Sequence, residues 1–238
     1  SAMSAEYLGN EFDIHAGGLD LIFPHHENEI AQTCCAFKSK KMANVWMHNG
    51  YITVNGDKMS KSEGNFITVR DALEKFDGEV IRYSLISGHY RSPIDFSFEG
   101  LKEAQVSLDR LYRSIESIEN KDNIDDEFNS ILCKDLNTPA ALSRMHELAK
   151  ESNRGSISAG QKLKSSGRLL GLLNKDSTNW FKAKIGNNEN FITKLIDDRN
   201  NARLKKDFEL ADSIREQLSS MGITIEDSDK GTKWRKSF

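Results

Sequence analysis

The spacing of hydrophobic residues changes near Phe98, and this change divides the chain into two kinds of structure. Before Phe98, "EFDIHAGG" alternates briefly and "VWMHNGYITV" is typical of extended chain, while segments with helical character follow each of them. After Phe98, apolar residues recur every three or four positions, as on one face of an α-helix. The first pattern predicts an α/β layer, and the second predicts a bundle of helices.

Local signals place several elements in the first part of the chain. Pro24 suits the first position of a helix that covers "HHENEIAQTCCAF". The dipeptide Asn55-Gly56 predicts a tight turn after "VWMHNGYITV". Thr68 and Asp71 predict a capping box for a helix that continues through Phe76, and "DGEVIRYSLISG" predicts the next helix.

The later part begins with an amphipathic stripe over residues 101–118, which we interpret as core packing. Thr138 and Pro139 predict the N-cap and first turn of a second helix, and "AGQKLKSSGRLLGLL" predicts a third. The segment "NKDSTNWFKAKIGNNEN" lacks periodicity and predicts a linker. Helices over residues 191–206 and 208–221, with Gly222 as a C-cap, precede two short strands in "ITIEDSDKGTKWR".

These patterns predict four segments. Residues 1–96 form an α/β layer, residues 97–175 a helical bundle, residues 176–189 a linker, and residues 190–238 a small terminal α/β module. The chain of 238 residues is long enough for more than one core.

Composition excludes several classes of protein. The formal net charge is −3, which argues against a uniformly basic nucleic-acid surface but allows a local basic patch. The apolar runs are too short to span a bilayer, and no signal-peptide pattern opens the chain. The cysteines Cys34, Cys35 and Cys133 do not form a disulfide framework, so we expect reduced thiols in the cytoplasm.

The stretch "PHHENE" raises the question of a metal site. His25 and Glu29 stand four residues apart on one face of the expected helix, whereas His26 is expected to point elsewhere. Imidazole and carboxylate are both zinc donors, but a zinc site needs three or four protein ligands, and neither Cys34 nor Cys35 falls on this face. On spacing alone, a solvated pair at the helix start, where acids offset the dipole, is the better interpretation.

The pentapeptide "KMSKS", residues 58–62, follows the expected turn. Lys58 and Lys61 can neutralise polyphosphate charge in a transition state, with Ser60 beside them and Gly64 as a point of flexibility. An ordinary charged loop is the alternative, and the exact pentapeptide is the reason to reject it.

Further candidate residues lie where predicted strands end. His15 and Asp20 flank the end of the first strand and His48 lies in a second extended segment, where α/β sheets usually bind ligands. Near the C-terminus, Trp234 lies between Lys233 and Arg235, a combination that suits stacking on single-stranded RNA. A basic tail with a core tryptophan explains this last pattern equally well.

Four segments resemble, in order, blocks of the cysteinyl-tRNA synthetase family within the class I aminoacyl-tRNA synthetases. They are "FDIHAGGLDLIFPHHENEIAQ", "WMHNGYITVNGDKMSKSEGNF", "RYSLISGHYRSPIDFS" and "DSDKGTKWR". The resemblance extends over nearly the whole chain and is loose between residues 120 and 190. "KMSKS" alone is typical of the class, and its combination with "FPHHENE" is much more specific. The resemblance implies the C-terminal half of a Rossmann-like class I catalytic domain, a DALR-type helical bundle, and an anticodon-recognition module.

The resemblance also implies the chemistry. In the family, one zinc ion is held by two cysteines, a histidine and a glutamate, and the last two match His25 and Glu29. The zinc binds the substrate thiolate, a stronger ligand than a serine hydroxyl, so cysteine is selected without editing. Cysteine, ATP with Mg²⁺, and cysteine tRNA are the implied partners of a cytoplasmic monomer. The implied contacts are Lys58, Ser60, Lys61 and His48 for ATP, His15 and Asp20 for substrate, and Lys233, Trp234 and Arg235 for tRNA.

Departures from the family pattern indicate a fragment. Ala16 replaces the first of three glycines after "FDIH", and the "HIGH" motif occurs nowhere in the sequence. By resemblance, one zinc cysteine lies in the missing half and the other immediately before Ser1, so we expect the chain alone to be inactive with weak zinc binding. Two rival functions are a cysteine ligase of thiol-cofactor biosynthesis, which joins cysteine to an amino sugar, and a non-catalytic RNA-binding protein.

Overall fold

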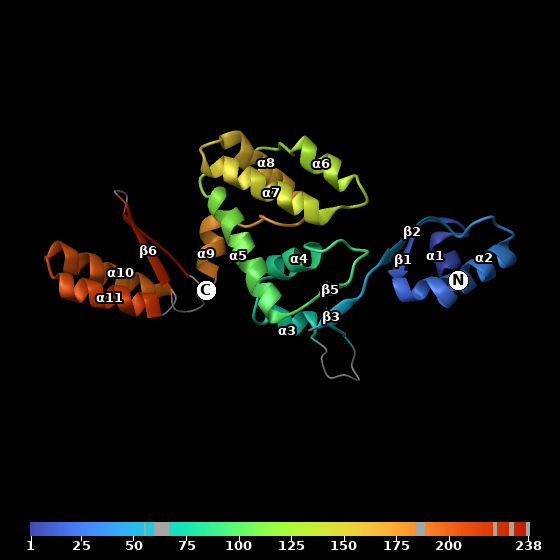
Figure 1. Cartoon of the computed structure of the whole chain (residues 1–238), viewed down its shortest axis with the longest axis horizontal. Helices are drawn as coiled ribbons and strands as arrows, with labels where there is room; N and C mark the ends of the chain where they lie inside the picture. Colours follow the sequence, from blue (N-terminus) through green and yellow to red (C-terminus); the bar gives the residue numbers. More distant parts are fainter. Residues whose placement is uncertain (55, 60–66, 184–188, 221–222, 229–230, 237–238) are drawn as a thin grey trace. The chain divides into compact units, whose positions relative to one another are not determined.

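The computed structural model describes residues 1–54, 56–59, 67–183, 189–220, 223–228 and 231–236 of the chain (Figure 1). It divides into two compact units, Ser1–Leu173 and Asn174–Phe238. Each unit is built around its own buried residues, and each is described separately below.

The first unit begins with a β–α–β arrangement. Its elements are α1 (Ala2–Leu8), β1 (Phe12–Gly18), the short helical turns η1 (Leu19–Leu21) and η2 (Ile22–His26), α2 (Glu27–Phe37) and β2 (Ala43–Asn49). Strands β1 and β2 are parallel, and α2 lies in the connection between them. The strand predicted in "EFDIHAGG" and the helix after it are confirmed. Phe23 is extended (φ −133°, ψ 133°), and the helical backbone follows it at Pro24.

A second, three-stranded sheet follows. It contains β3 (Ile52–Val54), β4 (Asp57–Lys58) and β5 (Ile94–Asp95) in the order β4-β3-β5. The antiparallel pairing of β3 and β4 confirms the predicted hairpin, although Asn55 lies outside the described residues. The capping box of Thr68 and Asp71 is also confirmed at the start of α3 (Val69–Leu73). This helix ends before Phe76, whose amide donates to the Ala72 carbonyl in a final turn.

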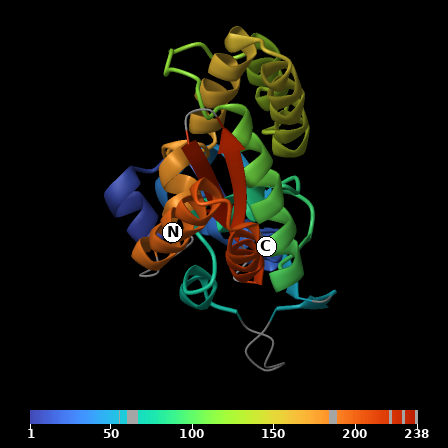
Figure 2. The same ribbon diagram turned by 90° about the vertical axis from the view of Figure 1, so that its left-hand side faces the viewer.

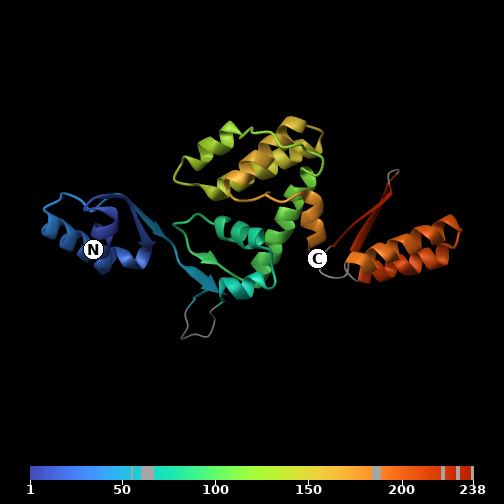
Figure 3. The same cartoon turned by 180° about the vertical axis from the view of Figure 1, so that it is seen from behind.

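Helices build the rest of the first unit. They are α4 (Gly78–Ile86), α5 (Phe98–Ser114), α6 (Asp126–Leu132), α7 (Thr138–Asn153) and α8 (Ile157–Leu169), and α7 lies beside α8 (Figure 3). The stripe predicted along α5 is buried at Leu101, Leu108 and Leu111. The N-cap of α7 is Asn137, whose side chain accepts from the Ala140 amide, and the prediction of Thr138 was wrong by one residue.

A buried carboxylate joins α4 to the helical bundle. Glu79 Oε2 accepts hydrogen bonds from the Tyr112 hydroxyl of α5 and from the Leu173 amide, both at 2.9 Å. On the same helix, the Tyr83 hydroxyl lies 2.8 Å from His146 Nε2 of α7. These contacts cross the boundary expected near residue 96, and they belong to one compact unit.

The second unit contains a helical pair and a β-hairpin (Figure 2). Its elements are α9 (Ser177–Ala183), α10 (Glu189–Leu204), α11 (Phe208–Ser220), β6 (Ile223–Ser228) and β7 (Gly231–Lys236). The helices and the hairpin close a core of Ile192, Ile196, Ile214, Leu218 and Ile223. Gly222, the expected C-cap, lies outside the described residues.

The prediction of a linker at residues 176–189 was wrong for part of this segment. Residues 177–183 of it form α9, and Trp180 within this helix is buried. One buried indole in a seven-residue helix produces little sequence periodicity, which is why the pattern did not reveal it. Within the described part of the chain, none of the helices combines the length and the apolar character that a membrane crossing requires.

Candidate active site on the first sheet

The register of β1 and β2 brings three aromatic side chains to one face of the sheet. His15 pairs with Trp46, and Gly17 pairs with His48 two positions further along. Because side chains alternate along a strand, these paired residues share a face. The ring centroids of His15 and Trp46 are 4.8 Å apart, and the Trp46 and His48 rings are stacked 6.2 Å apart. The sheet therefore presents a row of imidazoles and one indole.

The segment η2–α2 contacts the same face with polar groups. His26 Nδ1 lies 2.8 Å from His48 Nε2, and Glu29 Oε2 lies 3.1 Å from His15 Nε2. A Cβ atom at Gly17 would lie 2.9 Å from His26 Cε1, closer than real Cβ contacts, so this position of β1 requires glycine. The glycines after "FDIHA" thus allow the close approach of the second histidine in "PHHENE".

The placement of the two adjacent histidines corrects one expectation. His26, expected to point elsewhere, is only 3% exposed and belongs to the cluster, whereas the His25 side chain is 60% exposed. The backbone is helical from Pro24 onward, so His26 lies three residues before Glu29 and is its neighbour on the helix surface, as residues at i and i+3 are. His25 Nε2 still lies 3.7 Å from Glu29 Oε2, so the predicted His25–Glu29 pair is close in space.

The donor atoms of this cluster suit a metal ion. Ligand atoms of His15, His26 and Glu29 all lie within 4.8 Å of one another. Glu29 Oε2 is buried and has no hydrogen-bond partner among the described residues, because the nearby imidazole nitrogens are not in hydrogen-bonding geometry. A buried carboxylate oxygen without a partner costs free energy, and a cation would relieve that cost. Nitrogen and carboxylate donors are those that zinc accepts.

Electrostatics favour neutral imidazole at the centre of the cluster. Burial lowers the pKa of His26 below its ordinary value, and the neighbouring His15 and His48 lower it further. Neutral imidazole keeps a lone pair that can accept a proton or bind a metal. Ser1 lies at the edge of the cluster, with its amino group 3.7 Å from Glu29 Oε1.

The other predicted residues are distributed as follows. Asp20 lies in η1 and its carboxylate is close to the Gly18 backbone. Lys58 lies in β4, where its backbone pairs with Thr53, and the structure does not describe its side chain. Ser60 and Lys61 lie entirely outside the described residues.

The predicted RNA-binding residues lie on β7. Trp234 is half-buried and packs against the core of the second unit, in agreement with the core-tryptophan alternative. Lys233 and Arg235 flank it in the strand, and the structure does not describe their side chains.

Trp46 and His26 are the cluster members that sequence reasoning did not select. Trp46 could have been found, because it precedes His48 by two residues in a predicted strand and so shares its face. His26 could also have been found, because it lies three residues before Glu29, a spacing that makes two side chains neighbours on a helix.

Comparison with known proteins assigns the class. Residues 1–106 match a family model described as the class I (C) tRNA synthetase catalytic domain. A solved structure titled as the ternary complex of Agrobacterium radiobacter K84 agnB2 LeuRS-tRNA-LeuAMS superimposes with a TM-score of 0.52 and 16% identity. That superposition covers 74% of this chain and 28% of the other, and it supports the fold alone. The match of residues 1–106, on a fold of this kind, assigns the chain to the class I aminoacyl-tRNA synthetases.

The particular family follows from the remaining matches. Residues 127–175 match a DALR domain, and residues 192–235 match the cysteinyl-tRNA ligase anticodon binding domain. Proteins named cysteine–tRNA ligase are 47% identical in Gluconobacter oxydans and 46% identical in Azorhizobium caulinodans, over 100% and 98% of this chain. The chain belongs to the cysteinyl-tRNA synthetase family. It spans about half (52%) of the length of these two relatives.

Proposed function

We propose that this chain is the C-terminal part of a cysteine–tRNA ligase. The reaction activates cysteine with ATP to form cysteinyl-adenylate and pyrophosphate, and then transfers the cysteinyl group to the 3′ end of cysteine tRNA. The observation that carries the proposal is the convergence of imidazole nitrogens on the buried Glu29 oxygen, which has no hydrogen-bond partner in the described part of the chain. Identity of 47% with a cysteine–tRNA ligase, across the whole chain, supports the same reaction.

The Glu29 carboxylate, with His25 Nε2 3.7 Å from its Oε2, fits one zinc ion. Glu29 and His25 would hold it together with two cysteines of the parent protein, and bound zinc would favour the thiolate of cysteine over the hydroxyl of serine. His15 and His26 complete the surroundings and keep the carboxylate away from water.

The remaining residues bind and orient the substrates. We assign Lys58, Lys61, Ser60 and His48 to ATP, where the two ammonium groups neutralise charge on the phosphates beside Mg²⁺. His15 and Asp20 orient the amino acid. The proximity of His15 and His48 to the Glu29 cluster supports their roles, whereas those of Ser60 and Lys61 rest on the pentapeptide alone.

The tRNA-binding role belongs to residues 190–238, with residues 97–175 as the DALR-type bundle. The match of residues 192–235 to an anticodon binding domain supports tRNA over an amino sugar as the acceptor. Lys233 and Arg235 would contact RNA beside the exposed part of Trp234. We further propose a cytoplasmic monomer, in line with the three free cysteines in the chain.

Two measurements test the proposal. Filter binding compares cysteine tRNA with a mismatched tRNA, and equal retention of both would contradict the assignment. Zinc titration by calorimetry compares wild type with Glu29→Gln, which should bind at least about tenfold more weakly, and Glu27→Gln, an exposed carboxylate in the same helix, which should bind as wild type does. Cysteine-dependent pyrophosphate exchange by this chain alone would refute its description as an incomplete catalytic unit.

A further inference from the structure

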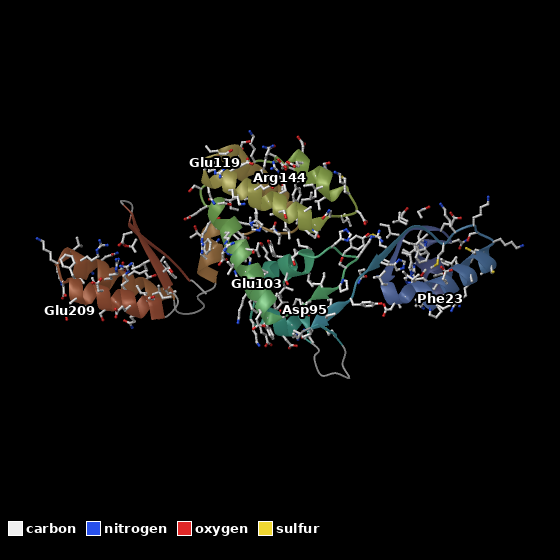
Figure 4. The ribbon with its side chains drawn as sticks, in the orientation of Figure 1. Phe23, Asp95, Glu103, Glu119, Arg144 and Glu209 are labelled. Carbon is white, nitrogen blue, oxygen red and sulfur yellow. The ribbon has the colours of Figure 1, made fainter. Side chains whose placement is uncertain are left out.

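Asp95 of β5 joins two parts of the β3–β4 hairpin through a single carboxylate oxygen. Its Oδ1 accepts a hydrogen bond from the Thr53 hydroxyl at 3.0 Å and another from the Gly56 backbone amide at 2.9 Å. Figure 4 labels Asp95 at the three-stranded sheet. Thr53 lies within β3 and Gly56 lies in the turn that leads to β4. One acceptor therefore fixes both the strand and the turn.

The register places Thr53 between Asp95 and Lys58. Thr53 pairs with Lys58 of β4 on one side and with Asp95 of β5 on the other. Backbone bonds hold β5 to β3 firmly, since the Phe96 amide donates to the Thr53 carbonyl at 2.8 Å. Strand β4 is only two residues long. Its position therefore depends strongly on the turn that precedes it, and the Asp95 carboxylate holds that turn.

The conformation of Gly56 directs its amide toward Asp95. Gly56 adopts φ +84°, in the left-handed region that glycine favours, and a Cβ here would meet nothing within 4 Å. The positive φ of this position favours glycine, whereas the space around it would accommodate a side chain. The turn places its N–H within hydrogen-bonding distance of a side chain from a strand 39 residues later in the chain.

We propose that Asp95 is a positioning residue for Lys58. By anchoring the β3–β4 turn to β5, Asp95 sets where the backbone of Lys58 leaves the sheet, and so where its ammonium group meets the phosphates. This inference rests on the proposed function, because it assumes that Lys58 contacts ATP. Small misplacements of a positioned group are costly in catalysis, which gives the anchor its effect on rate.

Hydrogen exchange in the present chain tests the anchor. Asp95→Ala should speed exchange of the Gly56 amide about tenfold, because its hydrogen bond is lost. Asp95→Asn keeps an Oδ1 acceptor and should restore protection. Glu99→Ala removes an exposed acid near the start of α5 and should change nothing at Gly56. Unchanged exchange in Asp95→Ala would overturn the proposal.

Pyrophosphate exchange in a full-length ligase that contains this chain tests the positioning role. Asp95→Ala should lower kcat about tenfold with the KM for cysteine unchanged, and Asp95→Asn should recover most of kcat. Faster Gly56 exchange with unaltered kcat would reduce Asp95 to a purely structural residue and overturn the positioning role. Absence of activity in the wild-type ligase would refute the proposed function instead. The exchange rate of the Gly56 amide would still test whether Asp95 anchors the turn.

Discussion

Asp125 is the residue whose replacement should most clearly destabilise the helical bundle. Its side chain is 3% exposed and accepts hydrogen bonds from Arg144 Nε at 3.0 Å, from Lys162 Nζ at 3.2 Å, and from the Phe128 amide as the N-cap of α6. Burial alone would raise the pKa of Asp125, but the hydrogen bonds from Arg144, Phe128 and Lys162 outweigh it and lower the pKa to about 2. The folded state therefore strongly favours the carboxylate.

The size of the effect follows from this pKa. Lowering a carboxyl from its ordinary value of 3.8 to about 2 corresponds to about 2 kcal/mol of stability. Loss of the N-cap adds about 1 kcal/mol, so Asp125→Ala should cost about 3 kcal/mol at pH 7. Asp125→Asn keeps a capping oxygen and should cost about 2 kcal/mol. Because the folded-state pKa is lowered, this contribution is present above pH 4 and is lost as the pH falls from about 4 to 2.

Native-state hydrogen exchange of the α6 and α7 amides measures this free energy within the bundle itself. Glu127→Ala is the matched control, since Glu127 Oε2 lies 3.2 Å from the same Arg144 Nε but its side chain is 63% exposed. The control should cost less than about 0.5 kcal/mol. A loss below that value for Asp125→Asn at pH 7 would refute the reasoning. So would a difference from wild type that stays constant between pH 6 and pH 2.

Two further predictions concern the other sites. Gly17→Ala should separate η2 from β1, because its Cβ would lie 2.9 Å from His26 Cε1. Zinc titration should then show at least about tenfold weaker binding with the secondary structure intact, and wild-type affinity would contradict the proposed crowding. Asp227→Ala should destabilise the second unit by about 1–2 kcal/mol, since it accepts two hydrogen bonds from Arg199, which is 6% exposed. Urea unfolding followed by tryptophan fluorescence measures this, and an unchanged midpoint would refute it.

Local chemistry was predictable to the extent that neighbouring residues decide it. The capping box at Thr68 requires only a partner three residues away, and the two-residue period of β1 and the stripe along α5 require only their own segments. The features that sequence patterns missed are an N-cap with two adjacent candidates and a short helix without a clear hydrophobic period. The N-cap of α7 is Asn137 and not its neighbour Thr138. Trp180 is buried in a short helix within the segment that was expected to be a linker.

Local sequence signals specify most of the elements and the residue types of the site, because helix period, strand period and turn chemistry act over a few residues. Packing against the sheet sets which of the two adjacent histidines is buried, because His26 contacts Gly17 of β1 and His48 of β2, whereas the His25 side chain is exposed. Tertiary structure also decided that Asp95 accepts from Gly56, since parallel pairing of β5 with β3 brings them together across 39 residues. Contacts of this kind depend on which strands lie side by side, and no local pattern encodes that choice.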